Sequence, residues 1–382
     1  MPGKINIGLY LFMILMILSS CDSNRPGKQQ PSSGGKTEPQ AEAEEMDDSS
    51  PTYALLVLPQ SPSPGQPFRI VATGGKNIHK AKIRITGPSG EMESQKNKVS
   101  GSSPYWRLDD FAGLPEGNYK ATLTIKKNEV CTLEFSVAPP KQVSRDGKVW
   151  KTLRGWDSSM EIFYSAWVNA LFQGCDEQTS WSSLHEVTQN QDRNFLHNCL
   201  SLGEDDPAGK NKVIMEPDCA DNPFFLRAYF SWKLGLPFGY HICDRGWVGR
   251  SPRTGQWITN ENSSSKSDPV QAFNSFLRNM MNGVHSGTGR TALNDENSDY
   301  YPLPLQQTVL RPGTVFADPY GHTFILVRWV PQTKENPGLL LAVDAQPDNT
   351  IAIKRFWRGN FLFNTEEVVG EPGFKAFRPI TF

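Results

Sequence analysis

The hydrophobic pattern of this chain changes at Pro139-Pro140, and that change limits the folds available to it. Before the two prolines, short β-rich runs alternate with turn residues such as Ser63-Pro64-Gly65. After them, from Val149 onward, apolar residues recur at three- and four-residue intervals, which is typical of an amphipathic helix. The prolines themselves are typical of a linker. The sequence therefore predicts an all-β region followed by a region of helices and strands.

The first region, residues 51–140, has the spacing of a small antiparallel sandwich. Alternation of polar and apolar residues is clear in Lys82-Ile83-Arg84-Ile85. The predicted strands are 53–58, 68–72, 81–86, 119–125 and 131–137. This arrangement resembles bacterial immunoglobulin-like modules. The resemblance implies a spacing or binding role, with an envelope protein as a possible partner.

The first twenty-one residues have the features of an export signal. Lys4 precedes an apolar run, 5–18, that is short for a bilayer span and fits a signal-peptide core. The run ends in Leu18-Ser19-Ser20-Cys21, which resembles the lipobox of bacterial lipoproteins. That resemblance implies that Cys21 carries a lipid and becomes the mature N-terminus, on the periplasmic side of the inner or the outer membrane. The alternative is an ordinary secretory signal.

Residues 22–50 contain no apolar periodicity and are rich in Pro, Gly, Ser, Gln and Glu. Such a composition cannot bury a core, so we expect a disordered tether between the membrane and the folded chain. The formal net charge of the whole chain is −1. With no basic surplus, we expect no nucleic-acid partner.

A second cysteine, Cys219, precedes an apolar run that fits a helix. Asp221 is predicted to cap this helix, Pro223 suits its first turn, and Gly235 followed by Pro237 predicts its end. Cys219 would then lie at the positive end of a helix dipole, which stabilises a thiolate. It could instead be a small buried cysteine or half of a disulfide.

The stretch that follows the helix is long and rich in glycine and serine, and we expect it to be largely unstructured. One helix should interrupt it, with Asp268 as its cap and Pro269 in its first position. Two loop histidines, His241 and His285, are candidates for substrate contact.

The C-terminal part predicts strands at 322–330, 339–344 and 350–353. His322 begins the first of these strands and Asp344 ends the second. If the two strands are antiparallel neighbours, the two side chains can form a hydrogen bond. His322 could instead be an edge residue, and Asp344 a turn former.

The chain combines a cysteine at a helix N-terminus, a histidine on a strand and an acceptor on the next strand. This combination resembles the papain-like arrangement. Over about residues 150–365 the chain is similar to the NlpC-type cell-wall peptidases, a branch of the papain-like fold. The similarity implies an α+β papain-like hydrolase domain over 141–382. It lies in Asp218-Cys219, in the Arg-Pro-Gly-Thr-Val-Phe run of 311–316, and in Gly321-His322. The chain departs from that family where Ala220-Asp221 replaces Ser-Gly and Thr314 replaces Asp.

The resemblance implies that Cys219 is the nucleophile, that His322 deprotonates it, and that Asp344 orients the imidazole. Gln346 and Asn349 are alternatives for the third position, and an Asp on this strand is the transglutaminase-like pattern. The backbone N–H groups of Cys219 and Ala220 would stabilise the oxyanion. The implied substrates are peptidoglycan stem peptides or cross-links. A non-catalytic envelope-binding lipoprotein and a transglutaminase-like acyl transferase stay open as alternatives.

Five cysteines remain once the lipobox cysteine is set aside, and an odd number leaves at least one thiol free. We expect Cys219 to be free, and Cys175 and Cys199 to form a disulfide. These two cysteines with His185 and His197 match no zinc spacing, so we expect no metal and no cofactor.

Overall fold

The computed structural model describes residues 52–140, 144–262, 264, 266–292, 294–306, 309–318, 321–335, 337–358 and 373–380. All of these residues belong to one compact unit, Met46–Phe382. The predicted signal segment with Cys21 and the predicted tether lie outside the described residues. Within the described ranges, no helix is both long enough and apolar enough to cross a bilayer.

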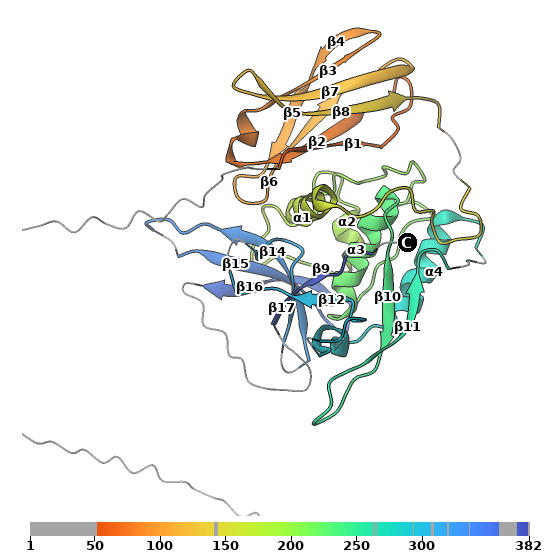
Figure 1. Ribbon diagram of the computed structural model, residues 1–382, viewed down its shortest axis with the longest axis vertical. Coiled ribbons are helices and arrows are strands. Elements are labelled where there is room, and N and C mark those ends of the chain that lie inside the picture. Colours follow the sequence, from red (N-terminus) through yellow and green to blue (C-terminus); the bar gives the residue numbers. More distant parts are fainter. Residues whose placement is uncertain are drawn as a thin grey trace, which may run out of the picture. The chain divides into compact units, whose positions relative to one another are not determined.

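The N-terminal part is an antiparallel β-sandwich region, drawn in orange and yellow in Figure 1. One sheet has the strand order β1-β2-β6-β5 and the other β4-β3-β7-β8. Apolar side chains from both sheets form a common core, which includes Ile70, Ile83 and Leu123. The strands are β1 Ala54–Leu58, β2 Phe68–Gly74, β3 Lys82–Gly87, β4 Gly90–Glu93, β5 Gln95–Val99, β6 Tyr105–Phe111, β7 Gly117–Ile125 and β8 Asn128–Val137.

The five predicted strands of this region are confirmed, but the sequence did not reveal β4, β5 and β6. Strand β6 buries two charged residues, Arg107 and Asp109, which break the expected alternation. The Arg107 guanidinium donates from Nη2 to Asp109 Oδ2 over 2.6 Å, and it also bonds the second carboxylate oxygen. Because each charge compensates the other, a buried strand can carry both.

The remainder is a mixed α/β region built around a seven-stranded sheet of order β12-β17-β13-β14-β15-β16-β9, in which all neighbours are antiparallel. Helices α1 and α3 both contact β14 (Figure 1). The helices are α1 Ser158–Leu171, α2 Leu184–Thr188, α3 Asp221–Leu234 and α4 Pro269–Met281. The strands are β9 Ser180–Trp181, β10 Gly239–Cys243, β11 Thr254–Thr259, β12 Tyr300–Pro302, β13 Val315–Ala317, β14 Thr323–Val330, β15 Leu339–Ala345, β16 Ile351–Arg358 and β17 Gly373–Phe377.

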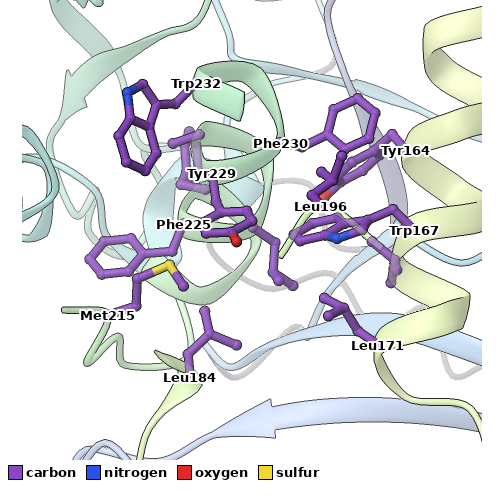
Figure 2. Packing of buried hydrophobic residues seen from close by; sticks show 14 of the residues in the cluster. Tyr164, Trp167, Leu171, Leu184, Leu196, Met215, Phe225, Tyr229, Phe230 and Trp232 are labelled. Carbon is purple, nitrogen blue, oxygen red and sulfur yellow. The ribbon is translucent and has the colours of Figure 1, made fainter. Parts of the chain in front are cut away.

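Helix α3 lies at the centre of the core, because every one of its residues is buried. Its Tyr229 stacks on Trp167 of α1, with ring centroids 5.4 Å apart (Figure 2). On another side its Trp232 stacks on Phe273 of α4, at 4.3 Å. The predicted α4 is confirmed with its cap, since the Asp268 side chain accepts a hydrogen bond from the Gln271 backbone.

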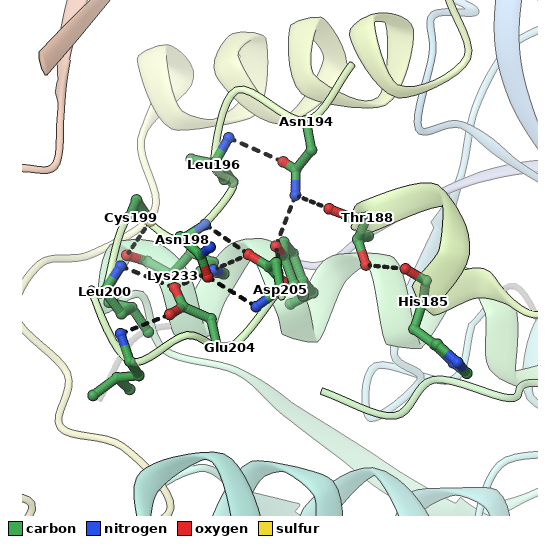
Figure 3. A network of polar contacts seen from close by, with 12 residues as sticks. His185, Thr188, Asn194, Leu196, Asn198, Cys199, Leu200, Glu204, Asp205 and Lys233 are labelled. Atoms are coloured by element: carbon green, nitrogen blue, oxygen red, sulfur yellow. Dashed lines mark hydrogen bonds and ion pairs between the residues drawn. The ribbon is translucent and has the colours of Figure 1, made fainter. Parts of the chain in front are cut away.

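A helix without a solvent-exposed face has to satisfy its polar residues internally, and Lys233 of α3 does so in a buried network (Figure 3). Its ammonium group bonds the carboxylates of Glu204 and Asp205. Asp205 also accepts a hydrogen bond of 2.8 Å from Tyr229, which in turn accepts one from Asn194. These bonds fix the 194–205 segment against α3.

The sandwich and the α/β region share buried contacts through α1. Trp106 of β6 donates from its indole nitrogen to Asn169 Oδ1 over 3.0 Å. Gln173, just after α1, donates to the backbone carbonyl of Val99 over 3.0 Å. One hydrophobic cluster accordingly includes residues of β1, β2 and β6 together with those of α1.

Two expectations about this region are wrong. The stretch after α3 is not largely unstructured, because β10 and β11 form an antiparallel hairpin in it. The predicted Cys175–Cys199 disulfide is absent, since both thiols are free. Cys199 packs beside the buried Lys233, and burial raises the pKa of the Cys199 thiol to about 12. The Cys175 thiol lies instead near the Gln173 carbonyl.

Candidate functional site

Cys219 lies two residues before α3, in a turn that leads into the helix. Ala220 already has helical angles (φ −75°, ψ −36°), and the Asn222 N–H donates to the Asp218 carbonyl, as in a helix. The Asp218 carboxylate accepts hydrogen bonds from the N–H groups of Ala220 and Asp221, at 2.9 and 3.2 Å. Asp218 is therefore the capping residue, and the prediction that Asp221 caps the helix is wrong.

Asp221 instead turns into the protein, where its side chain is buried. One carboxyl oxygen faces the Asp218 N–H at 3.5 Å, and the other has no hydrogen-bond partner among the described residues. Burial, and then the nearby charge of Asp218, raise the pKa of Asp221 to about 8. At neutral pH this carboxyl group is therefore mostly protonated, so it adds little negative charge beside Cys219.

His322 and Asp344 meet because β14 and β15 are antiparallel neighbours. Their register pairs Ile325 with Val343, which brings the residue before β14 beside the end of β15. The imidazole Nε2 lies 2.6 Å from Asp344 Oδ1. The other carboxylate oxygen accepts a hydrogen bond from the Gln346 side-chain amide. Asp344 is thus held from two sides, and it holds the imidazole in turn.

The Cys219 thiol lies close enough to His322 to contribute to the raised pKa of the imidazole, so the structure brings the three predicted side chains together. Since Nε2 faces Asp344, Nδ1 is left for the sulfur. The hydrogen bond with Asp344, followed by the interaction with Cys219, raises the pKa of His322 to about 10. The imidazole is then protonated at neutral pH, which places a positive charge near the Cys219 thiol.

The two predicted oxyanion donors, the N–H groups of Cys219 and Ala220, differ in whether they already make a hydrogen bond. The Ala220 N–H donates to Asp218 and is not free, which corrects the prediction for that residue. The Cys219 N–H makes no hydrogen bond within the part of the chain that the structure describes. Of the two, it is the donor left for a developing oxyanion.

The alternative third residues occupy other roles. Gln346 supports Asp344 and does not replace it at the imidazole. Asn349 lies in the turn between β15 and β16, with φ of 70°, and its N–H donates to the Gln346 carbonyl over 2.8 Å. In the described ranges, no group of three or more His, Cys, Asp or Glu side chains is placed to hold a metal ion.

The two histidines that were expected in loops, His241 and His285, lie in different surroundings. His285 precedes the 3₁₀ turn Ser286–Arg290. Burial and Arg245 lower the pKa of His285, whereas the charge of Asp218 acts in the opposite direction. His241 pairs with Asp299 and lies in β10.

The sequence patterns did not indicate that Asp218 and Gln346 support the other site residues. Asp218 and Asp221 are three positions apart, which is the spacing of a capping box, and that spacing could have located the helix start. No comparable local pattern marks Gln346, because its role depends on the end of β15.

Comparisons with known proteins give little beyond these observations. No protein-family model matches the chain, and no curated protein matches it. Among solved structures, a crystal structure of the Lin-41 filamin domain matches with a TM-score of 0.19 and 8% sequence identity. That match covers 22% of this chain and 93% of the filamin domain.

Proposed function

We propose that the protein is a cysteine hydrolase in which Cys219, His322 and Asp344 form a catalytic triad, with the α/β region as a papain-like, NlpC-type domain. The observation that carries the proposal is the position of His322, which bonds Asp344 through Nε2 at 2.6 Å and lies near enough to the Cys219 thiol for that thiol to help raise the pKa of the imidazole. The position of Cys219 just before α3 supports it, because the Cys219 N–H is free within the described chain and the positive end of the helix dipole stabilises negative charge.

In this mechanism the Cys219 thiolate attacks the carbonyl carbon of a peptide bond, and the new C–S bond makes a tetrahedral oxyanion. The Cys219 N–H donates to that oxyanion. Imidazolium Nδ1–H of His322 then gives its proton to the leaving amine as the C–N bond breaks, which leaves a thioester. A water molecule attacks the thioester after giving a proton to His322, and the free acid and the thiolate are released. Asp344 keeps the ring oriented in both steps.

The substrate that we propose is a peptidoglycan stem peptide or cross-link, reached from a lipid anchor at Cys21 in the cell envelope. The motivation is the export signal and lipobox-like sequence of residues 1–21 together with the cysteine site. An immunoglobulin-like sandwich would then set the distance to the wall or bind an envelope protein. Such a protein needs no nucleic acid and no cofactor.

The test compares purified wild-type protein with Cys219→Ser in the release of peptides from isolated sacculi. We expect Cys219→Ser and His322→Ala to abolish release. Cys131→Ser is the matched control, because Cys131 is also a free, half-buried thiol but lies on β8 of the sandwich. If the wild type releases nothing from sacculi or muropeptides and Cys219→Ser behaves like the wild type in cells, a non-catalytic binding lipoprotein is the better description.

A transglutaminase-like acyl transfer is the second candidate, and one observation favours it. The partner of His322 is a carboxylate on the following strand, Asp344, rather than a second imidazole. Both reactions share the thioester intermediate, but an acyl transferase passes the acyl group of that thioester to an amine and not to water. A primary amine such as glycine ethyl ester, added during the sacculus assay, would appear in the released peptides as an amide if transfer dominates. Free acids alone would support hydrolysis.

A further inference from the structure

A cavity of about 270 Å³ lies among residues that do not include the three proposed catalytic side chains. Three segments line most of it: the β10–β11 hairpin, the loop 296–299 before β12, and the residues from Phe377 to Ile380 that end β17 and follow it. The cavity combines aromatic side chains with a small number of charged groups, which is the usual composition of a ligand site.

A histidine–carboxylate pair forms the polar side of this cavity. His241 Nδ1 lies 2.8 Å from Asp299 Oδ1, and the His241 backbone N–H also donates to this carboxylate. The Asp299 side chain is buried, and these bonds hold its carboxylate in place. With Nδ1 engaged, Nε2 is the ring nitrogen left to meet a ligand.

An aromatic ring holds His241 in place from the neighbouring strand. Trp257 is the cross-strand partner of His241, and the two ring centroids are 4.4 Å apart. The indole also covers Gly239, where a Cβ atom would come within 2.5 Å of the ring. Glycine at this position therefore allows Trp257 to lie flat against β10, beside the imidazole.

Two arginines line the cavity, and they differ in their partners. Arg227 is buried, forms two hydrogen bonds with Glu161, and lies 3.3 Å from the Trp156 ring centroid, so its charge is already compensated. Arg378 has a buried Nε with no hydrogen-bond partner among the described residues. Its backbone N–H donates to the Asp299 carbonyl over 2.9 Å, which fixes it beside the histidine pair.

We propose that this cavity binds a small carboxylate with an apolar body. The Arg378 guanidinium and His241 Nε2 would bond the carboxylate, since a guanidinium is suited to planar anions. The rings of Trp257 and Phe377 would contact the apolar part. A sugar ring would need an open aromatic platform. However, Trp156 has Arg227 over its ring and stacks on Phe230, and His241 covers one face of Trp257.

The experiment uses benzoate and benzamide, which have nearly the same shape and differ in charge. Isothermal titration of the full chain should give saturable binding of benzoate with a Kd in the millimolar range or below, and at least tenfold weaker binding of benzamide. Arg378→Met should weaken benzoate binding about tenfold or more, Arg378→Lys should restore part of it, and His241→Asn should also weaken it. Arg355→Met is the control, because Arg355 is an arginine that pairs with Glu177 elsewhere.

Three results would overturn the proposal: equal affinity for benzoate and benzamide, no heat of binding at ten millimolar benzoate, or tighter binding of N-acetylglucosamine than of benzoate. Circular dichroism of each variant separates loss of binding from loss of fold. The inference does not depend on the proposed hydrolase, because Cys219→Ser should leave benzoate binding unchanged. Failure of either proposal can therefore be recognised separately.

Discussion

Replacing Asp221 with asparagine should remove a pH-dependent loss of stability. The pKa of Asp221 is raised from 3.8 to about 8 in the folded protein, chiefly by burial. Between these two values the unfolded chain loses the proton that the folded chain retains. The free energy of unfolding of the wild type should therefore fall by ~1.4 kcal/mol per pH unit relative to Asp221→Asn. The accumulated difference approaches ~6 kcal/mol above pH 8.

Asparagine is the appropriate substitution because it has the shape and hydrogen-bonding capacity of a protonated carboxyl group. Urea unfolding of both proteins, followed by circular dichroism from pH 4 to pH 9, gives the difference at each pH, and the titrations common to both proteins cancel. Asp192→Asn serves as the control, since Asp192 is exposed. A difference between wild type and Asp221→Asn that does not change with pH would refute the reasoning.

Three further predictions concern the triad, the buried network and the N-terminus. Because the pKa of His322 is raised to about 10, first by its bond to Asp344, the imidazolium is lost as the pH rises through that value. The alkaline limb of kcat/KM should therefore lie near pH 10, and in Asp344→Ala it should move to lower pH with weak residual activity. Lys233→Met should cost ~3–5 kcal/mol in urea unfolding, because it leaves buried carboxylates such as Glu204 without a counter-charge. Cys21→Ala should appear in cell fractionation as soluble protein or as unprocessed precursor; processed, membrane-bound protein would contradict the anchor.

The sequence predicted those elements whose local pattern agrees with their surroundings. The apolar runs of the sandwich, and α4 with its Asp268 cap, are determined by alternation and by end signals that operate over a few residues. Strand β6 escaped detection because Arg107 and Asp109 compensate each other inside the core. The β10–β11 hairpin escaped because its cross-strand pair, His241 and Trp257, does not form a local pattern.

The candidate site follows the same division. The neighbouring positions of His322 and Asp344 could be expected from two adjacent strands, and Cys219 from the helix that follows it. The exact start of that helix could not be expected from the sequence, because Asp218 and Asp221 could each cap it. Only burial in the folded protein determines that Asp221 turns inward. Whether Cys175 and Cys199 form a disulfide depends on tertiary packing alone, and their spacing in the sequence does not reveal that packing.

The complete burial of α3 has a consequence for motion. A helix that packs on all sides cannot open locally without disrupting the core, so its amide hydrogens should exchange with solvent only at the slow rates of global unfolding. Cys219, two residues before this helix, is then held nearly stationary on the timescale of the proposed reaction. In the proposed mechanism, an adjustment that admits a substrate would therefore have to come from the side of His322, which precedes β14 and does not belong to α3.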